Sequence, residues 1–477
     1  MNGLAKVMAN KKNKQRETKA GMLFSEYFEN TGFPPDDTVF LTDKRRAAAG
    51  HFAKTGFPST GSENWRKTDL TETLNRDYDI SFSSKERTLQ LKSIFECQVN
   101  DFDTDLFTIL NGYCINENKS LDTDSGIVVC SMTKAQHDYP ELFEKYFGTA
   151  AKDEKNGLTA LNTATFTDGY FIYVPDNTDY GRTIQMVNLI DAAKRIFTNT
   201  RNLVIVGRNA SLKLVHCDDS LSAHGSFVNT VTEFFVEDGG KLDFYKLQNK
   251  DEEATVITSN FIKQGRDTHT RSNTITLNGG LIRNDTVVEM NGRGGESEVY
   301  GLYLVDRRQF VDNHVFVDHA VSDCISRQLF KGIADEEARA VFNGHILVRQ
   351  DAQRTEAYQN NNNIQLTDTA AIDTHPFLEI YADDVKCSHG ATVGQLDTDA
   401  LFYMKQRGIC DRTARMLLMY SFAQEVINKI ELPALNESIQ DLVTRRLKGE
   451  LSACENCSLS CENPDSAITF DIDMSKI

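Results

Sequence analysis

The stretch from residue 273 to residue 305 reads NTITLNGGLIRNDTVVEMNGRGGESEVYGLYLV. Its short apolar segments are rich in Val, Ile, Leu and Tyr, and some alternate apolar with polar residues, as strands do. Asn278-Gly279 and Asn291-Gly292 fall between the segments, and these residue types tolerate the positive φ angles of tight turns. The stretch therefore predicts consecutive strands of about four to seven residues.

The same pattern continues from about Asn162 to Asp397 with almost no helical interruption. A β-sandwich, a β-barrel and a β-solenoid all contain short strands in series. A sandwich is usually complete in about half this length, whereas each unit of a solenoid stacks only on its neighbours and sets no such limit. No exact repeat motif occurs, so the pattern favours a solenoid slightly and leaves the other two folds open.

Helical patterns flank the strands. Near the N-terminus, Pro140 begins a short amphipathic segment that ends before Gly148. After Asp397 the apolar period changes to about 3.6 residues, which predicts a helix that stops at Gly408 and two more from Asp411 and from about Asn436. These patterns divide the chain into an N-terminal mainly helical region (1–150), a β core (151–396), a C-terminal helical domain (397–452) and a cysteine-containing tail (453–477).

Composition narrows the class of protein. The chain has 477 residues, of which 40% are hydrophobic, and its net charge of -17 argues against general affinity for nucleic acid. No apolar run of about 18 residues or more predicts a membrane span, and the first residues lack the apolar centre of an export signal, so we expect a cytoplasmic protein. The ten cysteines are mostly isolated, as thiols of a reducing compartment are.

No phosphate-binding loop is recognisable in the sequence. The nearest imitation, Asn291 to Gly295, lies between predicted strands, whereas such a loop precedes a helix. We therefore expect the chain not to hydrolyse nucleotides, and any energy-driven function to need a partner ATPase.

One group of side chains superficially resembles a metal site. It lies in VDNHVFVDHAVSDC, residues 311–324, and contains His314, Asp318, His319 and Cys324. On a strand His314 and Asp318 share a face while His319 points the other way. Two ligands are too few for a closed zinc site, so the favoured interpretation is a polar ladder along a strand.

Two cysteine patterns are stronger candidates for metal contact. Cys454, Cys457 and Cys461 form a CxxCxxxC run in the tail, which suits zinc or part of an iron–sulfur cluster but equally describes free thiols. In VKCSHGATVGQLD, residues 385–397, Cys387 and His389 fall on one face of an extended segment and can converge on one ligand. A Cys–His nucleophile would need a third, orienting group, so a transient metal or sulfur contact is the better chemical interpretation, with a packed strand end as the alternative.

The run HPFLEIYADDVKCSHGATVGQLDTDALFYMKQRGI, residues 375–409, closely resembles the SufB/SufD family of the SUF iron–sulfur cluster assembly system. Similar stretches include RQLFKGIADEEARAVFNGHILVRQ, NTATFTDGYFIYVP and ENWRKTDL, so the resemblance covers about residues 45–450. SufB members typically have Glu-His-Glu-Ala at the positions of Cys387 to Ala391, and a cysteine just before the proline that matches Pro376. This chain has neither, and the resemblance is therefore to the SufD branch.

The resemblance implies a right-handed parallel β-helix between helical domains, in a non-catalytic scaffold subunit. It also implies pairing with SufB through the β-helix, a transient iron–sulfur cluster at that interface with His389 as ligand and Cys387 as neighbour, and docking of the SufC ATPase on the C-terminal helices. Carried onto this chain, the docking residues are Phe402, Arg407, Gly408, Leu417, Leu418 and Phe422. Homodimerisation of the isolated chain and flavin binding stay open.

Two alternatives belong to other classes of function. A SufB-like homo-oligomeric scaffold would bind a cluster alone, and the missing cysteine before Pro376 counts against it. A carbohydrate-active β-helix enzyme would need paired carboxylates on successive rungs, about 5 to 10 Å apart.

Overall fold

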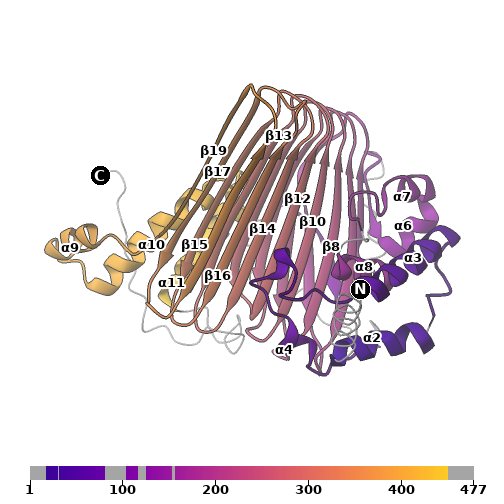
Figure 1. Ribbon diagram of the computed structural model, residues 1–477, viewed down its shortest axis with the longest axis horizontal. Coiled ribbons are helices and arrows are strands. Elements are labelled where there is room, and N and C mark those ends of the chain that lie inside the picture. The colour runs from indigo at the N-terminus through magenta and orange to yellow at the C-terminus, as the bar shows by residue number, and fades with distance from the viewer. Residues whose placement is uncertain (1–17, 31, 81–103, 116–124, 153–155, 450–477) are drawn as a thin grey trace, which may run out of the picture.

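Two long β-sheets form the body of the protein in the computed structural model, which describes residues 18–30, 32–80, 104–115, 125–152 and 156–449 (Figure 1). In spatial order the first sheet contains β19 (Val385–Gly394), β17 (Thr355–Gln365), β15 (Ile325–Ala334), β13 (Glu296–Val305), β11 (His269–Asn278), β9 (Lys241–Asn249), β7 (Ser211–Ser220), β5 (Asp179–Ile190), β1 (Thr104–Leu110) and β2 (Tyr113–Cys114). The second contains β18 (Ala371–Ile380), β16 (Arg339–Val348), β14 (Phe310–His319), β12 (Leu281–Met290), β10 (Thr255–Gln264), β8 (Phe227–Val236), β6 (Phe197–Val206), β4 (Tyr170–Val174) and β3 (Val128–Ser131).

The chain alternates between the sheets, because odd-numbered strands from β5 to β19 pair in parallel with one another and even-numbered strands from β4 to β18 do the same. Each pair of successive strands is thus one rung, stacked on the rung before it. This arrangement is a parallel β-solenoid, which confirms the fold that the sequence pattern favoured and the family resemblance implied.

The strands are longer than the sequence pattern predicted. β11, β12 and β13 each have ten residues, where segments of about four to seven were expected. The difference arises because polar side chains also face the space between the sheets, which we call the lumen. Asn284, for example, is buried there and bonds to Gln248 and Asn313 on neighbouring rungs, at 2.9 and 3.0 Å. Side chains on stacked rungs form hydrogen bonds with one another in such polar ladders. Because the residues are polar, a pattern of alternating apolar residues does not reveal that they are buried.

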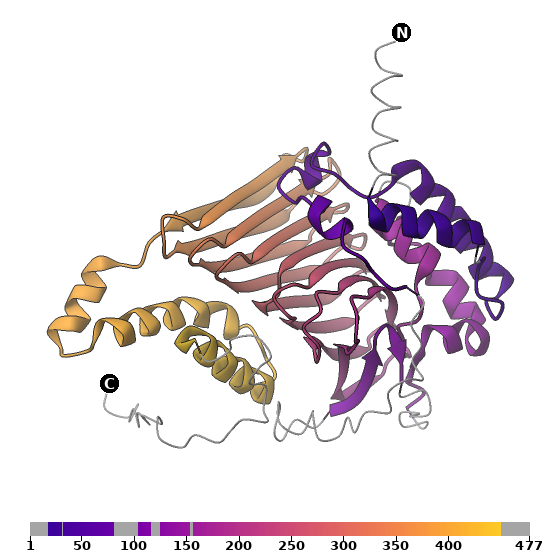
Figure 2. The ribbon, with the colours of Figure 1, turned by 90° about the horizontal axis from the view of Figure 1, so that it is seen from below.

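Helices near the N-terminus cover the outer face of the second sheet, most of them over its first strands (Figure 2). They are α2 (Lys19–Asn30), α3 (Val39–Thr55), η1 (Glu63–Trp65), α4 (Thr71–Leu74), α6 (Met132–Asp138), α7 (Pro140–Tyr146) and α8 (Gly157–Thr165). Phe24 of α2 meets Phe197 of β6 at a centroid distance of 4.9 Å, and Trp65 lies 3.8 Å from the guanidinium of Arg283 on β12. These contacts join the N-terminal elements to the solenoid.

In the described part of the chain, three helices follow the solenoid: α9 (Thr398–Gln406), α10 (Asp411–Ile427) and α11 (Pro433–Lys448). α10 and α11 cover the outer face of the first sheet, whereas α9 projects away from it (Figure 2). Asp397 caps α9 by accepting hydrogen bonds from the backbone N–H groups of residues 399 and 400, and α11 begins three residues before the predicted Asn436, since Pro433 suits a first helical turn. Within the described ranges no helix is long and apolar enough to span a bilayer.

Candidate functional site

The last rung of the solenoid, β18 and β19, carries the Cys–His pair. Both strands stand at the end of their sheets, so each has a strand neighbour on one side only. In the register between β17 and β19, Ala357 lies beside Cys387 and Gln359 beside His389. Ala357 and Gln359 are buried in the lumen, so Cys387 and His389 lie on the lumen-facing side of the end rung. The two share a face, as the alternation of an extended segment predicts.

The environments of the two side chains differ. Cys387 is half-buried and packs against a small apolar cluster that includes Ile346, Val348 and Ala382. Burial raises the pKa of the Cys387 thiol, although a hydrogen bond to the backbone of Ala357 partly opposes this shift. The thiol is therefore protonated at neutral pH, and a metal ion must displace that proton to bind sulfur. His389 is exposed to solvent.

The group in residues 311–324, which contains His314, Asp318, His319 and Cys324, makes contacts with other polar side chains. His314 Nε2 lies 2.9 Å from Asp312 Oδ1, and Asp318 forms a 2.6 Å ion pair with Arg349. His319 points into the lumen and contacts Ser326 Oγ at 2.8 Å. Among the residues that the structure describes, no three His, Cys, Asp or Glu side chains are arranged to hold a metal ion. His314 and Asp318 instead pair with polar side chains next to them. Cys324 is buried, and its thiol lies 3.4 Å from the backbone oxygen of Gly292.

The last rung also lacks a complete set of metal ligands among the described residues. Cys387 and His389 offer two ligand atoms at most, so a metal bound there would take its other ligands from elsewhere. Cys454, Cys457 and Cys461 lie outside the described residues.

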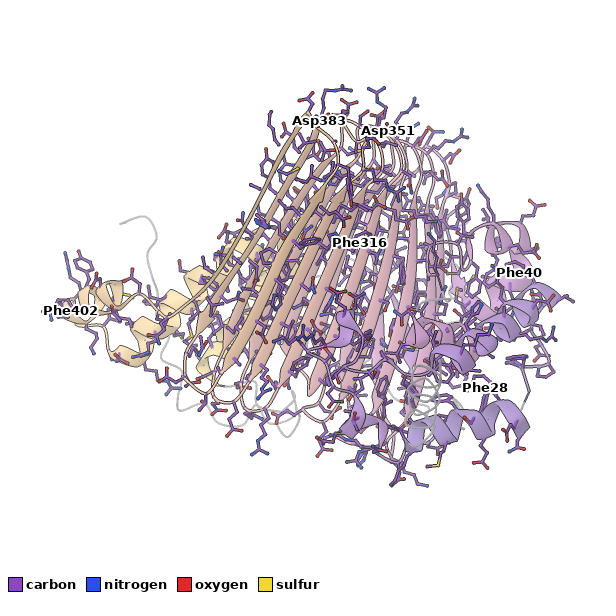
Figure 3. The ribbon with its side chains drawn as sticks, in the orientation of Figure 1. Phe28, Phe40, Phe316, Asp351, Asp383 and Phe402 are labelled. Carbon is purple, nitrogen blue, oxygen red and sulfur yellow. The ribbon has the colours of Figure 1, made fainter. Side chains whose placement is uncertain are left out.

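The predicted docking residues fall into two environments. Phe402 lies on α9, which projects away from the solenoid, and its side chain is 64% exposed (Figure 3). Arg407 follows the same helix and places its guanidinium 5.1 Å from the Tyr403 ring, and Gly408 then turns the chain with a φ of 85°. Tyr403 is 60% exposed and was missed by the sequence reasoning, although it adjoins Phe402.

Leu417, Leu418 and Phe422 lie on α10 and are partly buried. Leu418 and Phe422 pack toward the first sheet and line a cavity of about 420 Å³ between α10 and the ends of β17 and β19. The Phe422 ring also lies 4.4 Å from the ammonium group of Lys331. These two side chains hold α10 against the solenoid, so the exposed aromatic surface belongs to α9.

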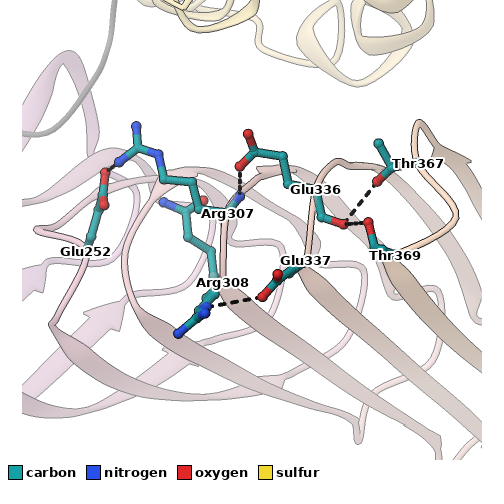
Figure 4. Close-up of a pocket in the computed structure, with 8 residues that line it drawn as sticks. Glu252, Arg307, Arg308, Glu336, Glu337, Thr367 and Thr369 are labelled. Atoms are coloured by element: carbon teal, nitrogen blue, oxygen red, sulfur yellow. Dashed lines mark hydrogen bonds and ion pairs between the residues drawn. The ribbon is translucent and has the colours of Figure 1, made fainter.

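A charged groove of about 700 Å³ lies where the strands turn beneath the C-terminal helices (Figure 4). Its charged groups pair with each other. Arg308 Nε contacts Glu337 Oε2 at 3.1 Å, Arg307 forms an ion pair with Glu252, and Glu336 accepts a bond from the Arg307 backbone. These pairs stabilise adjacent turns.

Comparison with known proteins agrees with this geometry. The family described as "SUF system FeS cluster assembly, SufBD core domain" matches residues 188–422, and "SufBD protein N-terminal region" matches residues 24–186. An iron–sulfur cluster assembly SufBD family protein of Synechocystis is 30% identical over 422 residues, which cover 86% of this chain and 92% of that protein. The iron–sulfur cluster assembly protein SufD of Escherichia coli is 33% identical over 263 residues, or 55% of each chain, and the chloroplastic protein ABCI7 of Arabidopsis thaliana is 28% identical over 430 residues, or 87% of each.

Fold and comparisons together define a β-solenoid scaffold protein of iron–sulfur cluster assembly. The chain belongs to the SufBD family of the SUF system.

Proposed function

We propose that this chain is the SufD-type subunit of a SufBCD-type complex, in which it pairs with SufB through its last rung and docks the SufC ATPase on its C-terminal helices. The identity to SufD of Escherichia coli supports the branch. The observation that carries the proposal is the last rung itself, where two open strand edges stand beside Cys387 and an exposed His389.

An open edge presents unpaired backbone N–H and C=O groups, and strands of a partner can bond to them. The outer face of this rung adds apolar contact area, because Phe377 and Tyr381 are 53% and 60% exposed. A partner that covers the rung would enclose Cys387 and His389 and supply the ligands that this chain lacks. Neutral imidazole and thiolate both suit iron, so the cargo of the interface is a nascent iron–sulfur cluster, with His389 as ligand and Cys387 beside it.

The ATPase would dock on α9. Large exposed aromatic side chains are typical anchors of protein interfaces, and Phe402 and Tyr403 are consecutive exposed residues of α9. Only residues 395–397 separate β19 from α9. Movement of an attached ATPase would therefore reach the strand of His389 directly.

The cluster role is tested by the substitution His389→Ala in the reconstituted complex. Cluster formation, followed by absorbance and Mössbauer spectroscopy, should fall strongly while the complex stays assembled. His375→Ala is the matched control, because His375 is an exposed histidine on the same rung but lies on its outer face. Full cluster formation by the His389 variant would disprove the ligand role.

The docking role is tested by the double substitution Phe402→Glu and Tyr403→Glu. Co-purification with the ATPase should be lost, because two carboxylates replace the exposed rings. Val39→Glu is the control, since Val39 is 80% exposed on an N-terminal helix. Undiminished co-purification of the α9 variant would exclude this surface.

A further inference from the structure

A column of polar side chains runs through the lumen to His389. Gln328 of β15 lies beside Gln359 of β17, and Gln359 lies beside His389 of β19, in three successive rungs of one sheet. Both glutamines are almost fully buried, with 2% and 1% exposure. Gln359 Nε2 donates a hydrogen bond of 2.7 Å to Gln328 Oε1. The buried amide pair therefore ends directly beneath the histidine.

Gly344 on the opposite sheet makes room for Gln359. A Cβ atom at Gly344 would overlap the Gln359 amide group, so only glycine lets this side chain extend across the lumen. Despite this accommodation, Gln359 Oε1 is buried without a hydrogen-bond partner among the described residues. Gln328 Nε2 of the same pair is also buried without a partner among these residues. A buried acceptor that makes no hydrogen bond is destabilising, so the Gln359 oxygen needs an explanation.

The neighbouring rungs supply one. Gln328 on the preceding rung already pairs with Gln359 Nε2, and His389 is the register neighbour of Gln359 on the following rung. His389 is therefore the candidate donor for Gln359 Oε1. A neutral imidazole has one N–H donor and one nitrogen lone pair, and histidine ligands commonly donate that N–H to an oxygen acceptor behind them.

We propose that Gln359 is a positioning residue that accepts the ring N–H of His389, fixes its tautomer and turns the other ring nitrogen toward the interface. The inference rests on the proposed ligand role of His389. Gln328 binds the other side of the Gln359 amide group, and the column ends at the exposed imidazole of His389.

The test compares three variants of the complete chain labelled with ¹⁵N-histidine, at a pH where imidazole is neutral. Gln359→Met removes the acceptor, Gln359→Glu keeps an acceptor oxygen, and Gln328→Met breaks the same amide pair from its other end. The His389 signals, assigned by their loss in His389→Ala, should report one tautomer in the wild type, in Gln359→Glu and in Gln328→Met. Gln359→Met should give a tautomer mixture.

A second readout is cluster affinity in the reconstituted complex, which should fall roughly 10- to 100-fold in Gln359→Met and recover in Gln359→Glu. An unchanged His389 tautomer in Gln359→Met would overturn the inference, as would an equal loss of order in Gln328→Met. If His389→Ala assembles clusters normally, the ligand role fails instead, and the tautomer measurement distinguishes the two failures.

Discussion

Replacing Arg446 by methionine should loosen the C-terminal helices from the solenoid. Arg446 lies near the end of α11, and its guanidinium binds both carboxylate oxygens of Asp306 at 2.7 and 2.8 Å. Its Nε atom also donates to the backbone oxygen of Leu277 at 2.8 Å. The Arg446 side chain is 7% exposed and that of Asp306 is 27% exposed. This single residue thus ties the helix to two strand ends of the first sheet.

The expected cost follows from these contacts. Removing one partner of a buried ion pair costs about 3 to 5 kcal/mol, and Asp306 keeps some access to water, which places the loss near the lower end. Methionine preserves most of the packing of the arginine stem. We therefore expect the free energy for local opening of α11 to fall by about 3 kcal/mol, which raises the equilibrium constant for opening roughly 100-fold.

Hydrogen exchange of α10 and α11 amides measures this opening directly. The control is Arg445→Met, because Arg445 is the neighbouring arginine and is only partly buried. If Arg446→Met lowers protection by less than about 1 kcal/mol beyond the control, a value typical of exposed ion pairs, the reasoning is wrong. Weakened attachment should also reduce any effect of ATPase docking on β19.

Two further predictions concern the lumen. Burial lowers the pKa of His319 to about 4 from the ordinary 6.5, so between pH 6.5 and 4 the unfolded chain binds a proton that the folded chain does not. The free energy of unfolding should fall by about 3 kcal/mol as the pH drops through this range, and His319→Gln should remove that part of the pH dependence in denaturant titrations, whereas an unchanged slope would contradict it. Gly332→Ala should cost about 1 to 3 kcal/mol because the new Cβ would overlap the Tyr303 ring. Gly394→Ala has open space and should change the same denaturation midpoint little, and equal effects of the two substitutions would refute the packing argument.

The sequence predicted most reliably what the local backbone determines. Alternation along a strand separated His314 and Asp318 from His319 and placed Cys387 with His389, because side-chain direction depends only on the strand itself. Parallel pairing was harder to predict, because register partners such as Gln328 and Gln359 are 31 residues apart. No local signal selects a solenoid over a sandwich.

The sequence also could not show which face of the C-terminal helices is exposed, because that depends on contacts with distant residues. An apolar stripe shows that Leu418 and Phe422 become buried, but not whether a sheet of the same chain or a partner buries them. The structure shows that they face the solenoid, and that the exposed aromatic pair lies on the preceding helix. The unpartnered oxygen of Gln359 was likewise invisible, because it depends on three rungs and a glycine on the opposite sheet.

Because the rungs stack at a fixed spacing, the number of rungs sets the length of the solenoid. Each added or removed rung would displace the terminal strand by one strand spacing, about 4.8 Å, relative to the N-terminal helices. The number of rungs therefore sets, in discrete steps, the distance between His389 and the N-terminal helices. A partner that touched both ends of the molecule could accept substitutions within a rung, but not a change in rung number.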